Sequence, residues 1–416
     1  MAISTATRID TAIVEATLDP YHNLPRAAVL AATSSTPVLY SGAGGYEQVP
    51  HNAADLPSAV KLTEDSSFTL WSCTKLPTAI ATLQLVEQGK VGLQSNASQW
   101  VPELKVLKLF TGFGEDGEPV LMENKTVVTV EMLILHTAGF IYEYHEPFGK
   151  LTKKLGLTLP YATDSKRESI TNMPFAFPPG ERWHYGTSQD WLALVIEKAS
   201  GLDLDTYFKK NIFEPLDIHD MTFKPDPKRI SMAYEPKTPG GPYTFDQGRL
   251  FSQTQYWGGT GLSGSPRSYL KILSCILRGG QAHNNEGNEG VRLLQPETVD
   301  EMFKNHLSSE QQLEDLREFT KTGNDPWTHR GRVAAPSMGH GYGGNLSGEG
   351  LPSGRGKGAL TWSGYANTYW HIDREKDLAF LIWTNIIPHS SPRLFDLWEK
   401  VEPLVYEGLA AAKLKA

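Results

Sequence analysis

Ser72 and Lys75 form a pattern that is typical of nucleophilic chemistry. They stand in the run Ser72-Cys73-Thr74-Lys75, and side chains three residues apart share one face of a helix. A serine hydroxyl whose proton is handled by a neighbouring amine can attack a carbonyl carbon and form an acyl-enzyme. The side chain of Cys73 would point about 100° around the helix from Ser72, so we expect Cys73 to pack in the core.

The Ser-x-x-Lys pattern alone cannot identify a nucleophile, because it recurs along the chain. Ser58–Lys61 and Ser268–Lys271 also match it. Ser72 differs in context, because the β-like run Phe68–Trp71 precedes it and the apolar periodicity of Leu76–Gln88 predicts a helix after it. The positive end of that helix dipole would favour an oxyanion. The alternative interpretation of Ser72 is a simple N-cap.

Two further segments carry side chains that could complete a site. Tyr185 lies in Gly180–Thr187, directly before a predicted helix, where a tyrosine usually packs its ring and leaves its hydroxyl as a polar tip. Trp362-Ser363-Gly364-Tyr365 opens a β-like region near the C-terminus, where the glycine would relieve crowding in an aromatic strand. Neither segment predicts catalysis by itself.

Apolar periodicity outlines the elements that have to position these residues. Strands at both ends with helices between them predict an α+β fold, in which an antiparallel sheet built from both termini is flanked by helices and carries an inserted, mostly helical lobe. Helices are predicted at residues 5–18, Leu76–Gln88, Gln189–Ala199, Pro266–Leu277 and Arg393–Leu414, and strands at Ala27–Ala32, Pro37–Tyr40, Leu360–Ile372 and Leu378–Asn385.

We therefore expect one domain over residues 1–416 with two lobes. The α/β lobe would span about 1–75 and 285–416, and the helical lobe about 76–284. Residues 224–256 are turn-rich and polar, and residues 305–358 change from charge-rich to glycine-rich. Long loops in compact proteins are often functional lids, so we predict lid-like loops at both places.

Composition excludes several classes of protein. The chain has 416 residues, with 39 lysines and arginines against 47 aspartates and glutamates, and its net charge of −8 does not suggest nucleic-acid binding. It lacks an apolar run of membrane-spanning length and a secretory signal pattern, and it has only two cysteines. We expect a cytoplasmic protein that does not enter a membrane. Its 12 histidines show no metal-ligand spacing, so neither a metal nor another cofactor is predicted.

In this order and with their flanking residues, the three segments resemble the serine β-lactamase and penicillin-binding-protein superfamily, most closely its class C-like branch of esterases and transesterases. Leu133–Gly139 is similar to the family's LLxHTSG motif, and Phe177–Gly201 to its PGxxxxYS segment with the helix that follows. Pro215–Phe223 and Gly258–Gly264 resemble two further family motifs. In length and local sequence the chain looks most like the fungal acyltransferases that load a short acyl group onto a statin-type polyketide alcohol.

The resemblance implies a β-lactamase-like fold and an acyl-enzyme mechanism. It makes Ser72 the nucleophile and Lys75 and Tyr185 the groups that handle its proton, and it assigns the oxyanion hole to the backbone N–H groups of Ser72 and Tyr365. A free lysine or tyrosine side chain titrates near pH ~10, so we expect the two side chains to share protons as a coupled pair. Which of them takes the Ser72 proton stays open.

Two departures separate this chain from true class C β-lactamases. Tyr185-Gly186-Thr187 replaces the Tyr-x-Asn element, and Trp362-Ser363-Gly364 replaces the Lys-Thr-Gly element and offers no cation for the carboxylate of a penicillin. A literal Lys321-Thr322-Gly323 exists, but its polar, turn-like context makes it the weaker candidate. β-Lactamase and D,D-peptidase activities are therefore less favoured alternatives.

The sequence thus predicts a serine acyltransferase or transesterase that moves an acyl group to the hydroxyl of a hydrophobic, secondary-metabolite-like acceptor. The resemblance implies a small-molecule acyl donor, either a simple thioester or an acyl group bound to a carrier protein. A carboxylesterase with the same nucleophile is the main alternative, and a non-catalytic binding relative is a lesser one. Aromatic residues in and near the motifs favour a hydrophobic pocket, and the predicted substrate-binding residues are Trp71, Tyr142, Trp183, Trp257, Trp362, Ser363 and Gly364.

Overall fold

The computed structural model describes residues 4–413, apart from residues 160, 230, 237, 239–240, 248–254, 284–288 and 322–336. Thr322 and Gly323 of the alternative Lys-Thr-Gly element lie outside the described residues, as do parts of both predicted lid-like loops.

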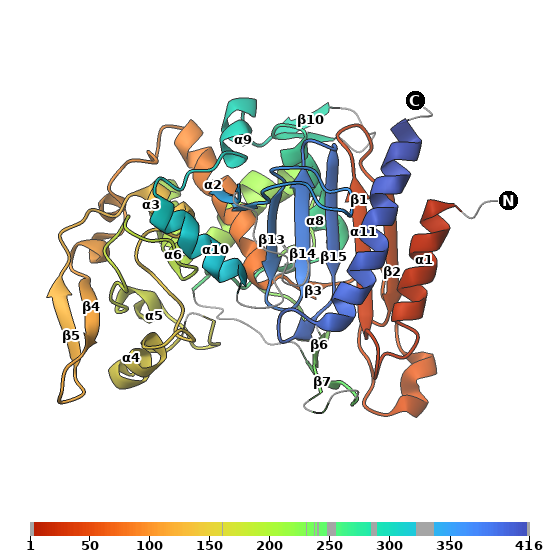
Figure 1. Ribbon diagram of the computed structural model, residues 1–416, viewed down its shortest axis with the longest axis horizontal. Helices are drawn as coiled ribbons and strands as arrows, with labels where there is room; N and C mark the ends of the chain where they lie inside the picture. The colour runs from red at the N-terminus through yellow and green to blue at the C-terminus, as the bar shows by residue number, and fades with distance from the viewer. Residues whose placement is uncertain are drawn as a thin grey trace.

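A seven-stranded antiparallel sheet forms the centre of the molecule (Figure 1). Its strands run in the order β11-β12-β13-β14-β15-β1-β2. β1, from the N-terminal part of the chain, pairs with β15 from the C-terminal part, with Ala28 opposite Trp383. The predicted α+β architecture is therefore confirmed. The strands are β1 Arg26–Ala32, β2 Tyr40–Gly45, β11 Gly339–Gly341, β12 Gly344–Leu346, β13 Leu360–Gly364, β14 Thr368–Asp373 and β15 Leu378–Trp383.

Helices cover both faces of this sheet, which explains why its central strands are apolar at nearly every position. All seven residues of β1 are buried, and successive side chains point to opposite faces. Leu30 belongs to the core that includes α2 and α8, whereas Val29 belongs to the core that includes α1 and α11. Figure 1 shows α1 and α11 side by side on the outer face. The four helices are α1 Thr5–Ala16, α2 Lys75–Glu87, α8 Pro266–Leu277 and α11 Pro392–Lys413.

The chain between β2 and β11 supplies the helices and short strands that surround α2. α6 packs against α2, and glycines with positive φ follow both helices, Gly89 at 67° and Gly201 at 76°, as their sequence positions predict. The remaining helices and strands are β3 Phe68–Thr69, β4 Lys108–Phe113, β5 Pro119–Glu123, α3 Val130–Ile134, α4 Phe148–Leu155, α5 Glu168–Thr171, α6 Ser188–Ser200, α7 Leu204–Phe208, β6 Ser231–Tyr234, β7 Thr244–Gln247, β8 Ser263–Gly264, β9 Gln281–His283, β10 Glu289–Arg292, α9 Pro296–Met302, α10 Glu310–Lys321 and β16 Ile386–Ile387.

Two strand predictions differ from the structure. The run Leu360–Ile372 forms two strands, β13 and β14, because the chain reverses at residues 365–367, where Asn367 has a φ of 59°. The second N-terminal strand is β2 and not Pro37–Tyr40. β2 contains glycines, which have low strand propensity, but a Cβ at Gly44 would lie 2.6 Å from Thr17 Oγ1. Glycine here allows the strand to approach the end of α1.

The predicted lobe boundary and the lid-like loops also need correction. α8 falls within the predicted helical lobe of residues 76–284, yet it packs on β1, β14 and β15 and so belongs with the sheet. Residues 224–256 contain β6 and β7, and residues 305–358 contain α10, β11 and β12. Glycine at position 341 of the second segment serves close packing, since a Cβ there would lie 2.0 Å from Met302 O. The rest of the two-lobe division stays a prediction.

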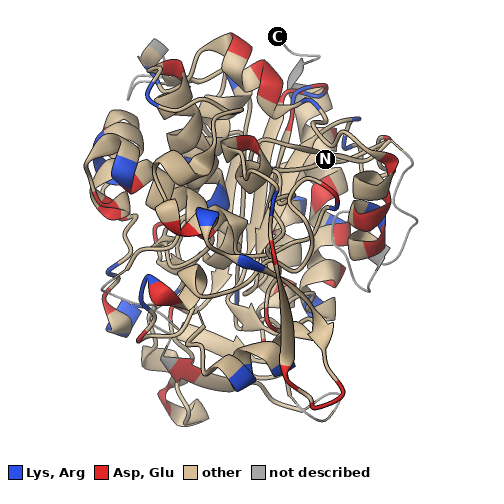
Figure 2. Ribbon diagram, turned by 90° about the vertical axis from the view of Figure 1, so that its left-hand side faces the viewer, with Lys and Arg blue, Asp and Glu red and all other residues tan. Residues whose placement is uncertain are grey.

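Charged residues of both signs are interspersed over the side of the molecule shown in Figure 2. Within the described residues, no helix combines the length and the hydropathy that a membrane span requires. In the same part of the chain, no group of three or more histidine, cysteine, aspartate or glutamate side chains is arranged to hold a metal ion.

Candidate active site

Ser72 lies in a short 3-10 turn, Trp71–Thr74, between β3 and α2. Trp71 has a φ of 48°, in the left-handed region that a bulky side chain rarely adopts. Thr74 Oγ1 holds the turn, because it donates to Trp71 O at 2.7 Å and accepts from Leu262 N at 3.2 Å. The N-cap position of α2 is Thr74, so the alternative interpretation of Ser72 as the cap is wrong.

Two segments remote in sequence bring a hydroxyl, an amine and a phenol together. Ser72 Oγ lies 2.5 Å from Tyr185 Oη, and Lys75 Nζ donates to Ser72 Oγ at 3.1 Å. Lys75 is 2% exposed, and its Nζ lies 4.8 Å from the centroid of the Tyr185 ring. The three side chains predicted to be catalytic are therefore in mutual contact. We call Ser72, Lys75 and Tyr185 the reactive set.

Lys75 has two further acceptors. Its Nζ donates to Gly259 O at 2.8 Å and to Tyr142 Oη at 3.3 Å. An ammonium group has three N–H donors and no acceptor, so the oxygens of Ser72, Tyr142 and Gly259 account for all three donors. Tyr142 is among the residues predicted to bind substrate. Gly259 is not, although it lies in the glycine-rich motif Gly258–Gly264.

Close backbone packing positions Tyr185. His184 N donates to His136 O at 3.0 Å, and a Cβ at Gly186 would lie 2.2 Å from Phe140 O. The segment that carries Tyr185 therefore runs along residues 136–142, and glycine at position 186 permits this approach. As a result the rings of Tyr142 and Tyr185 lie 5.1 Å apart.

The end of β13 lies beside the turn that carries Ser72. A Cβ at Gly364 would lie 2.1 Å from Leu70 O, so this glycine does relieve crowding, and it does so against the backbone that leads into the turn. The rings of Trp71 and Tyr365 are 5.3 Å apart. This places Tyr365 next to the nucleophile, while the role of its N–H group in an oxyanion hole stays a prediction.

The aromatic residues predicted to bind substrate differ in how close they lie to the reactive groups. The ring of Trp362 is 5.3 Å from that of Tyr185. All three tryptophans are buried, Trp362 at 3% exposed and Trp183 and Trp257 at 1% each, and Trp257 Nε1 donates to Ser165 Oγ at 2.9 Å. Substrate binding by these residues stays a prediction, and the contact with the Tyr185 ring favours Trp362.

Sequence reasoning missed the side chains of His136, Phe319 and His389 near the site. The ring of His136 lies 5.2 Å from that of Tyr185, and α10 places the Phe319 ring 5.6 Å from it. His389 Nε2 lies 3.0 Å from Ser363 Oγ. His136 had a signal in the LLxHTSG-like motif, whereas Phe319 falls within a segment predicted as a loop, and His389 stands in no recognised motif.

Burial keeps two histidines and one tyrosine near the reactive set uncharged at neutral pH. It lowers the pKa of His136 well below its ordinary value and lowers the pKa of His389 to about 4. Burial also raises the pKa of the Tyr142 phenol well above its ordinary value of 10. Tyr142 is therefore a neutral hydroxyl that accepts from Lys75, and the two imidazoles carry no charge.

The competing nucleophile candidates have other partners. Cys73 is fully buried, and burial raises the pKa of its thiol to about 12, in agreement with the expected packing role. Ser58 donates to Asp55 O at 2.8 Å, and Ser268 donates to a carboxylate oxygen of Asp220. Of the three Ser-x-x-Lys matches, Ser72 is therefore the one whose hydroxyl accepts from its lysine.

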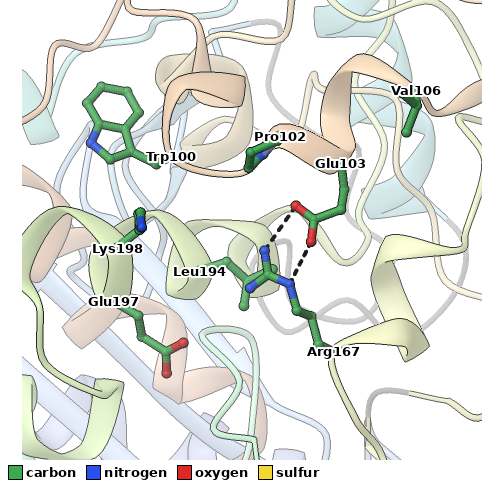
Figure 3. A pocket seen from close by; sticks show the side chains of 8 residues that line it. All are labelled: Trp100, Pro102, Glu103, Val106, Arg167, Leu194, Glu197 and Lys198. Carbon is green, nitrogen blue, oxygen red and sulfur yellow. Dashed lines mark hydrogen bonds and ion pairs between the residues drawn. The ribbon is translucent and has the colours of Figure 1, made fainter.

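A separate cavity of about 730 Å³ is lined in part by the second half of α6 (Figure 3). Among the residues that the structure describes, no hydroxyl or thiol side chain lines it, and Glu103 and Arg167 in its lining pair with each other at 2.7 and 3.0 Å. We therefore assign no chemistry to this cavity. Its lining residues are Trp100, Pro102, Glu103, Val106, Arg167, Leu194, Glu197 and Lys198.

A serine hydroxyl in contact with a lysine ammonium and a tyrosine phenol, held beside an antiparallel sheet with helices on both faces, defines the class of serine enzymes that work through an acyl-enzyme. The chain belongs to the β-lactamase family: the family model described as Beta-lactamase matches residues 14–400. The predicted superfamily is therefore confirmed, and the chain is an enzyme of this family.

Comparisons with known proteins point to the fungal branch of the family. The chain is 30% identical to the monacolin J acid methylbutanoyltransferase of Aspergillus terreus over 92% of each chain. It is 31% identical to the lovastatin esterase of Penicillium rubens over 84% of this chain and 87% of the relative. The solved structure of a simvastatin synthase variant from Aspergillus terreus matches with a TM-score of 0.82 and 28% identity, over 98% of this chain and 96% of that one.

Proposed function

We propose that this protein is an acyltransferase that carries an acyl group on Ser72 and delivers it to the hydroxyl of a hydrophobic acceptor. The observation that carries the proposal is the 2.5 Å contact between Ser72 Oγ and Tyr185 Oη, with Lys75 Nζ 3.1 Å from the same Ser72 oxygen. The fungal relative at 30% identity is a methylbutanoyltransferase, which supports a short acyl group as the cargo and a polyketide-like alcohol as the acceptor.

In the first half-reaction Ser72 Oγ attacks the carbonyl carbon of the donor and loses its proton. The phenolate oxygen of Tyr185 takes this proton and becomes a neutral phenol, because Tyr185 Oη is the closer partner and the Lys75 ammonium, whose three donors already have acceptors, has no lone pair to receive it. Lys75 acts as a fixed cation that stabilises negative charge on the Ser72 and Tyr185 oxygens. When the tetrahedral intermediate collapses, the bond to the leaving group breaks and Tyr185 returns the proton to the departing thiol or alcohol.

The second half-reaction reverses these steps with a new partner. The acceptor hydroxyl gives its proton to Tyr185 and its oxygen attacks the acyl carbon. The bond to Ser72 Oγ then breaks, and Ser72 recovers the proton. The roles of the Ser72 and Tyr365 N–H groups as oxyanion donors belong to the same proposal, and the packing of Gly364 against Leu70 O supports them.

The acceptor pocket is proposed to be hydrophobic because aromatic rings lie next to the reactive set. Tyr142 and Trp362 lie 5.1 and 5.3 Å from the Tyr185 ring. An indole at Trp362 also stands where β-lactamases carry a cation, which disfavours β-lactamase and D,D-peptidase activity. We further propose a small-molecule thioester or a carrier-bound acyl group as donor and a cytoplasmic location, which the free thiols of Cys73 and Cys275 support.

Hydrolysis of esters by the same serine is the second candidate function. One relative at 31% identity is a lovastatin esterase, and a carboxylesterase needs the same Ser72, Lys75 and Tyr185. The two functions differ only in whether water or an alcohol reaches the acyl-enzyme. The aromatic rings around Tyr185 favour a hydrophobic acceptor over water, so we place acyl transfer first.

Competition between an alcohol and water tests this proposal. The protein is incubated with p-nitrophenyl butyrate and increasing concentrations of a hydrophobic alcohol, and both butyrate ester and free butyrate are quantified. We expect ester to become the main product as the alcohol concentration rises. Free butyrate formed at a constant rate, with no ester at any alcohol concentration, would identify the protein as an esterase.

A further inference from the structure

Asp190 is a buried acid that connects α6 with the reactive set. It lies in the first turn of α6 and is 1% exposed. Its Oδ1 accepts from Gly259 N at 2.8 Å, and the carbonyl oxygen of the same glycine accepts from Lys75 Nζ at 2.8 Å. Asp190 therefore positions Gly259, and the carbonyl oxygen of Gly259 in turn positions Lys75.

Glycine at two successive positions makes this arrangement possible. A Cβ at Gly259 would lie 2.8 Å from Asp190 Oδ1, and a Cβ at Gly258 would lie 2.1 Å from Gln189 O. The segment Gly258–Gly259 therefore packs directly against the start of α6, and the Asp190 carboxylate fixes its backbone through a hydrogen bond. A shift of this segment would move the Gly259 carbonyl and, with it, one of the three acceptors of Lys75.

The charge on Asp190 also acts on Lys75. The titratable groups that face the carboxylate in the described structure are Lys75 from α2 and Tyr142 from the segment after α3, and Gly259 contributes an uncharged N–H. Burial raises the pKa of Asp190 to about 6, although the Lys75 charge and the Gly259 N–H act to lower it. A buried carboxylate is costly without a counter-charge, and Lys75 supplies that charge.

We propose that Asp190 is a positioning residue for acyl transfer: its carboxylate fixes the Gly259 backbone and balances the Lys75 ammonium, so that Lys75 stays a cation that donates to the Ser72 oxygen beside the Tyr185 ring. This inference rests on the proposed function of Ser72. It assigns to Asp190 a role through Lys75, without contact between Asp190 and the substrate. Ionised Asp190 is the active form.

Two substitutions separate the hydrogen bond from the charge. Asp190→Asn keeps an acceptor for Gly259 N–H but removes the charge, whereas Asp190→Ala removes both. Asp205→Asn is the matched control, because Asp205 is also buried, on the neighbouring α7, and pairs with Lys209 at 2.7 Å. Thermal unfolding of each variant shows whether it is folded, and the conservative Asp190→Asn carries the test if Asp190→Ala is not.

The readout is kcat and KM for p-nitrophenyl butyrate between pH 4.5 and 9, on the full chain. At pH 8 we expect kcat to fall roughly 10-fold in Asp190→Asn, as for the loss of one charge-assisted interaction, and about 100-fold in Asp190→Ala, as for a displaced catalytic group. KM should stay within a few-fold. The wild-type rate should decline below a pH of about 6, and this decline should be absent in Asp190→Asn and retained in Asp205→Asn.

Two results would overturn the inference, and they are distinguishable. If wild-type protein forms no acyl-Ser72, both the proposed function and the role of Asp190 fail. If wild-type protein acylates Ser72, but folded Asp190→Asn has the wild-type kcat and the wild-type decline below pH 6, the role of Asp190 alone fails.

Discussion

Tyr185 Oη lies 2.5 Å from Ser72 Oγ, although 113 positions separate the two residues in the chain. The contact depends on two close approaches that only glycine permits: Gly186 against Phe140 O and Gly364 against Leu70 O. The Gly186 contact brings Tyr185 close to Ser72. The Gly364 contact places the end of β13 beside the turn that carries Ser72. The geometry of the reactive set is thus built from backbone packing as much as from the reactive side chains.

Lys75 and Tyr185 should act as one unit. Lys75→Ala and Tyr185→Phe are each expected to lower kcat by about three orders of magnitude, and the double variant should lose little more than either single variant. The reason is that Lys75 stabilises the oxygen of Tyr185, so that removing one group disables the other. A double-mutant cycle on the pre-steady-state acylation rate measures this, and losses that simply multiply would contradict it.

Gly364 should be intolerant of any side chain. Gly364→Ala places a Cβ where the distance to Leu70 O is 2.1 Å, so the turn that carries Ser72 must move. We expect about 100-fold lower kcat and a loss of roughly 1–3 kcal/mol in the free energy of unfolding. Gly408→Ala is the control, because this helical glycine in α11 has space for a Cβ at 3.5 Å from Thr5. A wild-type rate in Gly364→Ala would show that the turn does not need this contact.

Ionisation of Asp190 should lower the free energy of unfolding at neutral pH while it supports activity. Burial raises the pKa of Asp190 from 3.8 to about 6, so the folded state binds the proton more tightly than the unfolded state. The cost of ionising the carboxylate in the folded state is therefore largest above pH 6, where it reaches up to about 3 kcal/mol, and it disappears below pH 4. Between pH 4 and pH 7.5 the free energy of unfolding of wild type, measured with denaturant, should fall by about this amount relative to that of Asp190→Asn, which cannot ionise at this position. A wild type that gains stability relative to Asp190→Asn over this range would contradict this sign.

Trp362 should control the choice between alcohol and water. Trp362→Ala removes a ring that lies 5.3 Å from the Tyr185 ring, so we expect KM for a hydrophobic alcohol to rise about 10-fold and the share of free acid to increase. Trp100→Ala is the control, since Trp100 lines the separate cavity in Figure 3. An unchanged ratio of ester to acid in Trp362→Ala would remove Trp362 from the acceptor pocket.

Local sequence patterns predicted much of this fold, and the resemblance to the family assigned the three reactive side chains; the patterns failed where tertiary packing decides. α2, α6 and α8 were predictable because apolar periodicity and a following glycine mark them. β11 and β12 were not, because glycines that allow close packing and glycines of a flexible loop have the same sequence signature. Asp190 was missed for a similar reason: an aspartate in the first turn of a helix is expected from the helix dipole alone. Only the contact with Gly259 distinguishes its role.

Intact-protein mass spectrometry after mixing with p-nitrophenyl butyrate tests the central claim most directly. The wild-type chain should gain the mass of one butyryl group, peptide mapping should locate it at Ser72, and a chase with a hydrophobic alcohol should remove it as the butyrate ester. Ser72→Ala should gain no mass and should unfold at nearly the wild-type temperature, whereas Ser268→Ala should behave as wild type. A butyryl group on any other residue, or an acyl-enzyme in the Ser72→Ala chain, would contradict the account.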